Sequence, residues 1–199
     1  MDGIQAVNCH SVVVANGQAG FRRDHSTSHH IFTFRCLIEE AKDTGQKVFC
    51  CFVDFRRAFD SVPRHLLVER LRSLGLPDDM IDGVLTLYER VLARFRDGSA
   101  TVRSTVGVKQ GCPLSPTLFA LYIDELEGVI REEGGEGCPL AHLLIPILLY
   151  ADDVVLLSPS AYGLQKHLQA LHTFCMRWGL QVNLAKTKIM IFHTNIQTM

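Results

Sequence analysis

The stretch that most restricts the fold is residues 143–157, in which one apolar run reaches two adjacent carboxylates and a second apolar run follows them. The two acids, Asp152 and Asp153, come directly after Tyr150 and Ala151. Apolar runs on both sides of a short polar pair predict two buried strands joined by a tight turn. Ionised carboxylates at the edge of a hydrophobic sheet repel each other and lose hydration, so bound cations would stabilise them. The alternative is an ordinary polar hairpin tip, because Asp is common in turns.

The composition is that of a globular chain without a membrane span. Of its 199 residues 47% are hydrophobic, which suffices for one domain with a substantial core. The longest apolar stretch, near residues 140–149, contains His142 and Pro146 and is too short to cross a bilayer. The net charge of −1 does not by itself indicate a nucleic-acid-binding protein. Any such function must therefore rest on local groups.

The cysteines and the N-terminus favour an intracellular location. The seven cysteines lack paired spacing, and Cys50 and Cys51 are adjacent in an apolar run. This pattern predicts buried free thiols in a reducing compartment, rather than disulfides or a zinc site. The first residues lack the basic and apolar regions of a secretory signal.

Hydrophobic periodicity predicts a mixed sheet covered by helices, in one α+β unit. Expected helices are one capped by Ser26 or Thr27 and ending near Asp43, one opened by Pro63, one from Asp78 through Leu92, one capped by Ser115 with Pro116 at its first position and running to Ile130, and one from about Tyr162 to Trp178. Expected strands are residues 47–55, a hairpin over 94–106 turning at Asp97-Gly98, the two strands around Asp152, and residues 189–192.

Asp54 stands near the end of the predicted strand 47–55, where a carboxylate needs a partner. If this strand neighbours the one that ends before Asp152 and Asp153, three carboxylates converge. Such a set suits a pair of Mg²⁺ ions, which prefer oxygen ligands and leave coordination positions for phosphates. Two metals ~3.5–4 Å apart support in-line displacement at phosphorus, since one activates the attacking hydroxyl and the other stabilises the leaving group.

Five segments resemble, in order, the motifs of reverse transcriptases of the non-LTR retrotransposon and group II intron type. They are Gln18–Arg22 with Ser26-Thr27 (the finger motif), Phe52–Val62 (the first carboxylate motif), Gln110–Pro116 (the template- and nucleotide-binding loop), Tyr150–Asp153 (the catalytic hairpin), and Gly179-Leu180 with Asn183 and Lys186-Thr187 (the closing palm motif). Together they cover residues 18–188.

The resemblance implies a right-hand polymerase palm, with an antiparallel sheet packed on helices, partial fingers and no thumb. It implies a single domain over residues 1–199, with partial fingers at about 1–46, palm at 47–75, a fingers/palm insertion at 76–108 and palm at 109–199. The implied reaction extends a primer with deoxynucleotides on an RNA or DNA template. The implied cofactor is a pair of Mg²⁺ ions, with Mn²⁺ as a substitute.

The resemblance also assigns the groups of the reaction centre. Asp54 and Asp152 would be the principal ligands of both metals, and Asp153 a third acid with a looser contact. Lys186 matches a lysine proposed to protonate the departing pyrophosphate; its alternative is an ordinary solvated surface lysine. Positioning and charge neutralisation would supply most of the rate.

Five further residues would bind substrate. The backbone around Phe55 would cradle the triphosphate, and the ring of Phe59 would stack under the deoxyribose and exclude a 2′-hydroxyl. Gln110 would contact the nucleotide or template near the minor groove, and Gly111 would permit close backbone approach. Arg22 would touch template or triphosphate. Without the motif, Phe59 would be interpreted as an ordinary core residue and Arg22 as part of a solvated loop.

The resemblance is incomplete, because a triphosphate-gripping finger segment, a primer grip, a thumb and an endonuclease are not visible. We therefore expect a fragment of a retrotransposon polyprotein, located in the nucleus or cytoplasm, whose missing thumb and endonuclease segments are potential partners. Two alternatives stay open. An RNA-dependent RNA polymerase is disfavoured by Phe59 and by Ala151 before the acids. A catalytically incompetent palm relic, acting only as a nucleic-acid-binding or interaction module, is disfavoured by the intact Asp54, Asp152 and Asp153.

Overall fold

A four-stranded antiparallel sheet organises the chain, with strand order β6-β7-β1-β8. The computed structural model describes residues 20, 26–89, 92–94, 101–103, 106–109 and 111–193. The sheet consists of β1 (Val48–Val53), β6 (Ile147–Tyr150), β7 (Asp153–Ser158) and β8 (Lys188–Phe192). The predicted strands 47–55 and 189–192 and the hairpin around Asp152 are thus confirmed.

Seven helices and two small hairpins complete the described part of the chain. The helices are α2 (Thr27–Asp43), α3 (Ala58–Ser61), α4 (Arg64–Ser73), α5 (Asp78–Glu89), α6 (Ser115–Ile123), α7 (Glu125–Glu133) and α8 (Ala161–Trp178). The hairpins pair β2 (Leu92–Arg94) with β3 (Thr101–Arg103), and β4 (Cys138–Leu140) with β5 (Leu143–Ile145). None of the helices in these ranges combines the length and apolar character that a bilayer crossing requires.

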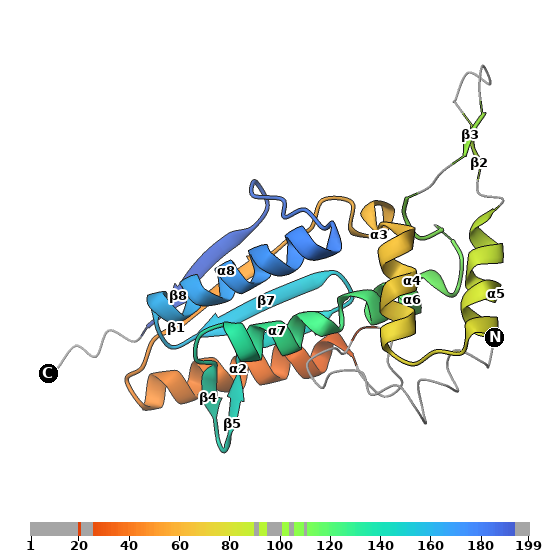
Figure 1. Ribbon diagram of the computed structural model, residues 1–199. Coiled ribbons are helices and arrows are strands. Elements are labelled where there is room, and N and C mark those ends of the chain that lie inside the picture. The colour runs from red at the N-terminus through yellow and green to blue at the C-terminus, as the bar shows by residue number, and fades with distance from the viewer. Residues whose placement is uncertain are drawn as a thin grey trace, which may run out of the picture.

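Helices cover both faces of the sheet, which explains why β1 is apolar almost throughout. Cys51 and Val53 of β1 belong to the larger core, together with residues of α6, α7 and α8. The alternate residues Val48 and Cys50 belong to a smaller core formed with α2. Figure 1 shows α7 and α8 on one side of the sheet and α2 on the other. Side chains of a strand alternate between faces, so a strand buried on both sides reads as a continuous apolar run.

The cysteines of the described ranges are all free. Cys50, Cys51, Cys138 and Cys175 are buried, as the sequence predicts, whereas Cys36 and Cys112 are partly exposed. Burial raises the pKa of Cys50 and of Cys51 to about 11, so these two thiols stay protonated at neutral pH.

The predicted single helix from Ser115 to Ile130 is instead two helices, α6 and α7, that meet at Asp124. The Arg70 side chain inserts at the junction, where its Nε donates to Leu121 O at 3.1 Å. In an unbroken helix this carbonyl accepts only from the amide of residue 125, so an inserted donor accounts for the interruption.

Three local predictions are also corrected. Ser115 is the first residue of α6 rather than its cap, because its hydroxyl points back and donates to Lys109 O, and Pro116 is the second helical residue. Helix α5 ends at Glu89, and Leu92 begins β2, where it pairs with Arg103. The apolar run before Asp152 is divided between β5 and β6 by Pro146, which has no amide to donate.

The buried His167 of α8 should make the stability of the folded protein sensitive to acid. Its ring is 0% exposed, Nε2 donates to Gly135 O at 2.9 Å, and Nδ1 has no hydrogen-bond partner within the described residues. Burial therefore lowers the pKa of His167 in the folded state. The unfolded chain binds the proton more tightly, so stability is full above the unfolded pKa of about 6.5 and is lost as the pH falls through the lower folded-state pKa.

We expect the free energy of unfolding, measured in urea, to fall between pH 7 and pH 5 with a contribution from His167 of up to about 1.4 kcal/mol per pH unit. A His167→Gln variant should show a shallower slope over this range than the unmodified protein. Identical slopes would mean that His167 does not titrate differently on folding.

Candidate active site

The three predicted carboxylates lie at one end of the sheet. Val53, the last residue of β1, pairs with Val154, and Tyr150 pairs with Asp153 across the β6–β7 hairpin. Asp54 therefore emerges beside the start of β7, where Asp153 begins the strand and Asp152 occupies the two-residue turn. Figure 1 shows that this end of the sheet, where β1 ends and β7 begins, is the one nearest α3. Non-local strand pairing thus brings together acids from two distant segments.

The turn that carries Asp152 is under local strain. Ala151 has φ 57°, in the left-handed region that disfavours residues with a Cβ. Ala151 is buried, while Asp152 is half-buried and Asp153 is exposed. A tight turn with a left-handed residue keeps the two acids at the tip of an otherwise apolar hairpin.

The surroundings of Asp152 disfavour its ionised form. Burial raises its pKa most, the charges of Asp153 and Asp54 raise it further, and a hydrogen bond from its own backbone opposes these effects in part. The two neighbours therefore lie close enough to act on Asp152. A bound cation would oppose all of these effects, and an all-carboxylate donor set fits a hard divalent ion such as Mg²⁺.

The carboxylates do not form a preassembled cage. In the described ranges, no group of three or more His, Cys, Asp or Glu side chains is placed to hold one metal ion. Asp54 instead contacts the segment before β8, where Lys186 Nζ lies 3.9 Å from Asp54 Oδ1. Because the Lys186 side chain is 71% exposed, this ion pair contributes little to stability and is easily broken. A metal would require the three carboxylates to turn toward one another.

Asn183 and Thr187 also hold Asp54, and neither was assigned a role from the sequence. Asn183 Nδ2 donates to Asp54 Oδ2 at 2.9 Å, and the amide of Asp54 donates to Thr187 Oγ1 at 3.2 Å. The only sequence signal was their place in the closing palm motif, since no local periodicity links residues so far apart in the chain.

A cleft of about 730 Å³ opens beside Asp54, with Asn183 and Lys186 on its lining. Two further cations, Arg56 and Arg57, also line it. This volume lies in the range of small-molecule sites. The lining therefore contains three cations and two carboxylates, Asp54 and Asp60, and this mixture suits a ligand that carries both phosphates and a metal ion.

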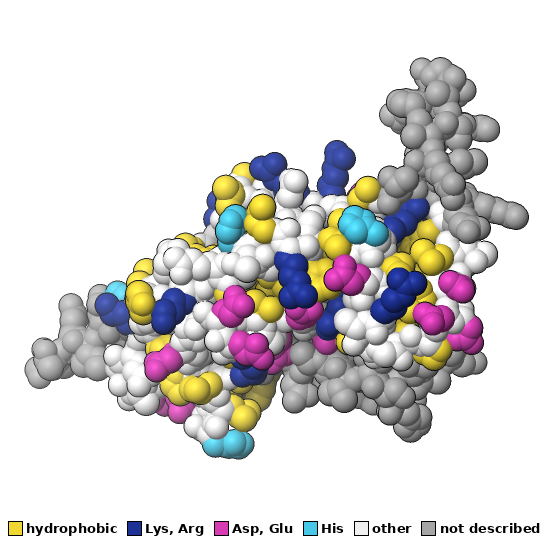
Figure 2. Space-filling model, in the orientation of Figure 1, with side chains coloured by type: hydrophobic (Ala, Val, Ile, Leu, Met, Phe, Trp, Pro, Cys, Tyr) yellow, Lys and Arg dark blue, Asp and Glu magenta, His cyan; other side chains and the backbone are white. Residues whose placement is uncertain are grey.

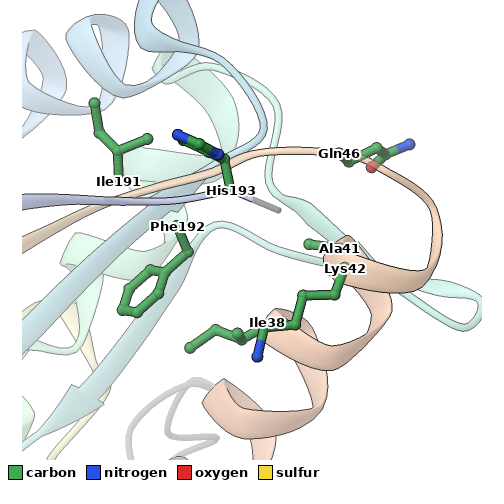
Figure 3. A pocket seen from close by; sticks show the side chains of 7 residues that line it. All are labelled: Ile38, Ala41, Lys42, Gln46, Ile191, Phe192 and His193. Atoms are coloured by element: carbon green, nitrogen blue, oxygen red, sulfur yellow. The ribbon is translucent and has the colours of Figure 1, made fainter. Parts of the chain in front are cut away.

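A second cavity, of about 220 Å³, lies between α2 and β8. In Figure 3, Phe192 and Ile38 lie between the strand and the helix, whereas Ile191 points away. Its lining contains Lys42 and His193 but no carboxylate. This cavity is distinct from the candidate active site.

Phe59 rests on a rigid platform. Its ring stacks on that of Phe119, with centroids 4.6 Å apart and planes inclined by 24°, and Phe119 is 0% exposed. The backbone of Phe59 is fixed as well, because its carbonyl accepts from the amide of Val108 at 2.8 Å. The ring thus packs against the core, and its contact with a deoxyribose stays a prediction.

The other predicted substrate contacts are only partly described. Arg22 and Gln110 lie outside the described residues. Gly111 has φ 77°, which explains the need for glycine, although nothing lies within 4 Å of the position of a Cβ. Phe55 is buried, and the amides on either side of it, of Asp54 and Arg56, are occupied by Thr187 Oγ1 and by Gln181 O. These two amides therefore do not contribute to a phosphate cradle.

Comparison with known proteins identifies the family. The profile described as reverse transcriptase (RNA-dependent DNA polymerase) matches residues 4–198. The chain belongs to the reverse transcriptase family. The resemblance inferred from the five motifs is thereby confirmed.

Similar reverse transcriptases come from insect retrotransposons. The chain is 32% identical over 190 residues to a probable RNA-directed DNA polymerase from transposon BS of Drosophila melanogaster, covering 88% of the chain and 20% of that protein. It is 27% identical over 189 residues to the RNA-directed DNA polymerase from mobile element jockey of Drosophila funebris, covering 90% and 20%. It is 29% identical over 154 residues to a Pol polyprotein from a type-1 R2 element of Bradysia coprophila, covering 76% and 18%. The chain thus spans about a fifth of the length of these relatives.

The fold of this reverse transcriptase chain resembles that of telomerase. A telomerase of Candida tropicalis, solved with the TWJ fragment of telomeric RNA, superposes with a TM-score of 0.69 at 14% identity, covering 98% of the chain and 33% of the telomerase. A telomerase of Candida albicans gives a TM-score of 0.67 at 13% identity. These matches support the expected palm-like arrangement of an antiparallel sheet and helices.

Proposed function

We propose that the chain is the catalytic palm of an RNA-directed DNA polymerase, which extends a primer 3′-hydroxyl with dNTPs on an RNA or DNA template. The observation that carries the proposal is that strand pairing places Asp54, Asp152 and Asp153 at the same end of the sheet, where Asp54 also lines a cleft that contains Arg56, Arg57 and Lys186. Membership of the reverse transcriptase family supports it.

In this proposal Asp54 and Asp152 hold two Mg²⁺ ions, with Asp153 as a looser ligand. The ions would acidify the primer 3′-hydroxyl and neutralise the developing charge on the leaving pyrophosphate. Lys186 is poised to change partners, because its contact with Asp54 is long and exposed. Its ammonium is then available to donate a proton to the pyrophosphate oxygen. Arg56 and Arg57 contribute positive charge to the triphosphate side of the cleft.

The proposal treats the whole chain as one reverse transcriptase domain. Palm segments occupy about 47–75 and 109–199, partial fingers about 1–46, and the insertion 76–108. Gln110 and Arg22 keep their proposed contacts with template and nucleotide. On the face shown in Figure 2, basic and acidic side chains are interspersed. A template held by such a surface would depend on the cleft and on the remainder of the polyprotein.

Template-directed incorporation of dTTP on poly(rA)/oligo(dT) tests the proposed function. The assay compares the chain alone with the chain fused to the segment that follows the matching region in the jockey polymerase. Mg²⁺-dependent incorporation by either protein supports the proposal. Folded protein that incorporates nothing in both forms would favour the catalytically incompetent palm.

A Phe59→Val substitution tests nucleotide selection. The smaller side chain removes the ring that would collide with a 2′-hydroxyl, so discrimination between dTTP and UTP, measured as the ratio of kcat/KM values, should fall by about 10- to 200-fold. Phe49→Val is a matched control, since Phe49 packs partly buried against the same core. An unchanged ratio in the Phe59 variant, or an equal change in the control, would contradict the role of Phe59.

A further inference from the structure

Asn183 contacts Asp54 through both its backbone and its side chain. Its amide donates to Asp54 O at 2.7 Å, and its Nδ2 donates to Asp54 Oδ2 at 2.9 Å. Both residues are half-buried, so these bonds compete less with water than fully exposed ones do. One residue therefore fixes the path of the chain at Asp54 and the direction of its carboxylate.

The position of Asp54 explains why such a clamp is needed. Regular pairing of β1 with β8 ends at Phe52 and Lys188, two residues before Asp54. Beyond this point the chain is held by Asn183 and Thr187, and then by the bridge between Phe55 and Val182. Backbone and side-chain bonds from the segment before β8 thus hold the chain at Asp54, where the regular pairing of β1 with β8 has ended.

The segment that carries Asn183 is itself ordered by the same residue. Asn183 O accepts from the amide of Lys186 at 3.1 Å and from that of Thr187 at 2.9 Å. The turn closed by these bonds places the Thr187 hydroxyl against the amide of Asp54. Asn183 and Thr187 therefore act on different parts of Asp54, namely the carboxylate and the backbone N–H.

The chemistry of an amide donor suits a metal-binding carboxylate. An ionised carboxylate only accepts hydrogen bonds, so Asn183 must present its NH₂ group to Asp54 Oδ2. This bond orients the carboxylate and leaves its negative charge in place. An ammonium or guanidinium group in the same position would neutralise that charge. Asp54 Oδ1, whose neighbour is the loosely placed Lys186, stays accessible to a cation.

We propose that Asn183 is a positioning residue for the metal-binding carboxylate of Asp54, an inference that rests on the proposed function. Hydrogen-bond partners of metal ligands commonly change metal affinity by about 10- to 100-fold when they are removed. Asn183 acts through Asp54 and does not itself touch the metal. Its loss should therefore weaken cation binding without abolishing it.

The test measures Mn²⁺ affinity by electron paramagnetic resonance, in the absence of nucleotide and primer. Asn183→Leu keeps the number and branching of the side-chain heavy atoms and the backbone bonds but removes the donor, and should weaken Mn²⁺ binding by about 10- to 100-fold. Thr187→Val is the matched control, because it removes the bond to the Asp54 amide and leaves the carboxylate bond intact. Thermal unfolding should show that the two variants are destabilised to a similar extent. Only Thr187→Val should keep a Mn²⁺ affinity near that of the unmodified protein. Asn183→Ser, whose hydroxyl is too short to replace the amide, should show the same loss if Asn183→Leu does not fold.

Unchanged affinity in the Asn183 variants would overturn the inference, as would an equal loss in Thr187→Val, since that loss would be merely structural. Asp152→Asn in the same titration separates this outcome from failure of the proposed function. If the unmodified protein binds no Mn²⁺ in an Asp152-dependent manner, the metal site itself is refuted. If Asp152-dependent binding is present and only the Asn183 effect is missing, the metal site stands and the positioning role fails.

Discussion

An Asp152→Asn variant is expected to lose Mg²⁺-dependent nucleotide incorporation by about 10³-fold or more, equivalent to about 4 kcal/mol of transition-state stabilisation. The substitution keeps the size of the side chain but removes the negative charge of a proposed metal ligand at the tip of the β6–β7 hairpin. Because Asp54 and Asp153 remain, some cation binding should survive. The geometry for in-line attack should be lost, because it requires two ions at fixed positions.

The same variant should fold at least as stably as the unmodified protein when no divalent ion is present. The raised pKa of Asp152 means that folding disfavours its ionised form, because of burial and of the charges on Asp153 and Asp54. A neutral amide removes that cost at neutral pH. Thermal unfolding with and without Mg²⁺ should therefore show a midpoint that rises with Mg²⁺ in the unmodified protein and rises less in the variant.

Glu133→Gln provides the control for Asp152→Asn. Glu133 is an exposed acid at the end of α7, away from the carboxylate end of the sheet. This variant should retain both incorporation and the response to Mg²⁺. Full activity in Asp152→Asn, or equal losses in the two variants, would contradict the assignment of Asp152.

An Arg70→Met variant is expected to lose about 3–5 kcal/mol in free energy of unfolding, measured in urea. The Arg70 side chain is only 11% exposed and lies 3.7 Å from Asp124 and 3.3 Å from Glu125. It also donates to Leu121 O at the junction of α6 and α7. The substitution keeps most of the apolar stem but removes a buried cation that faces two carboxylates, of which Glu125 keeps its contact with Arg177.

Arg72→Met, on the same helix, is the matched control. Its side chain is 61% exposed and reaches Asp78 only at 3.9 Å. Loss of such a surface pair should cost less than about 1 kcal/mol. Similar losses for Arg70→Met and Arg72→Met would show that the buried network does not stabilise the α6–α7 junction.

Local patterns were sufficient to predict most elements and the carboxylate end of the sheet. The continuous apolar run of β1 reflects burial on both faces, and the Asp152-Asp153 turn is bounded by apolar strands that leave few alternatives. Asp54 was identifiable because a carboxylate at the end of a buried strand needs an explanation. These features depend on neighbours in sequence or on the simple geometry of a sheet.

The features that sequence reasoning missed depend on contacts between distant segments. Asn183 is 129 positions from Asp54, and nothing in its neighbours indicates a bond to that carboxylate. The break between α6 and α7 arises from Arg70, which is 51 positions from the carbonyl it contacts. The apolar stripe of the two helices continues across the junction, so hydrophobic periodicity alone predicts one helix.

Anomalous diffraction from crystals soaked in Mn²⁺ would test the three-carboxylate metal site most directly. The expected result is a peak at the end of the sheet, with oxygen atoms of Asp54 and Asp152 about 2.1 Å away and Asp153 as a longer or water-mediated ligand. A second peak ~3.5–4 Å from the first is expected when a primer and nucleotide are also bound. Fully occupied Mn²⁺ sites elsewhere on the protein, with no anomalous peak between Asp54 and Asp152, would contradict the two-metal assignment.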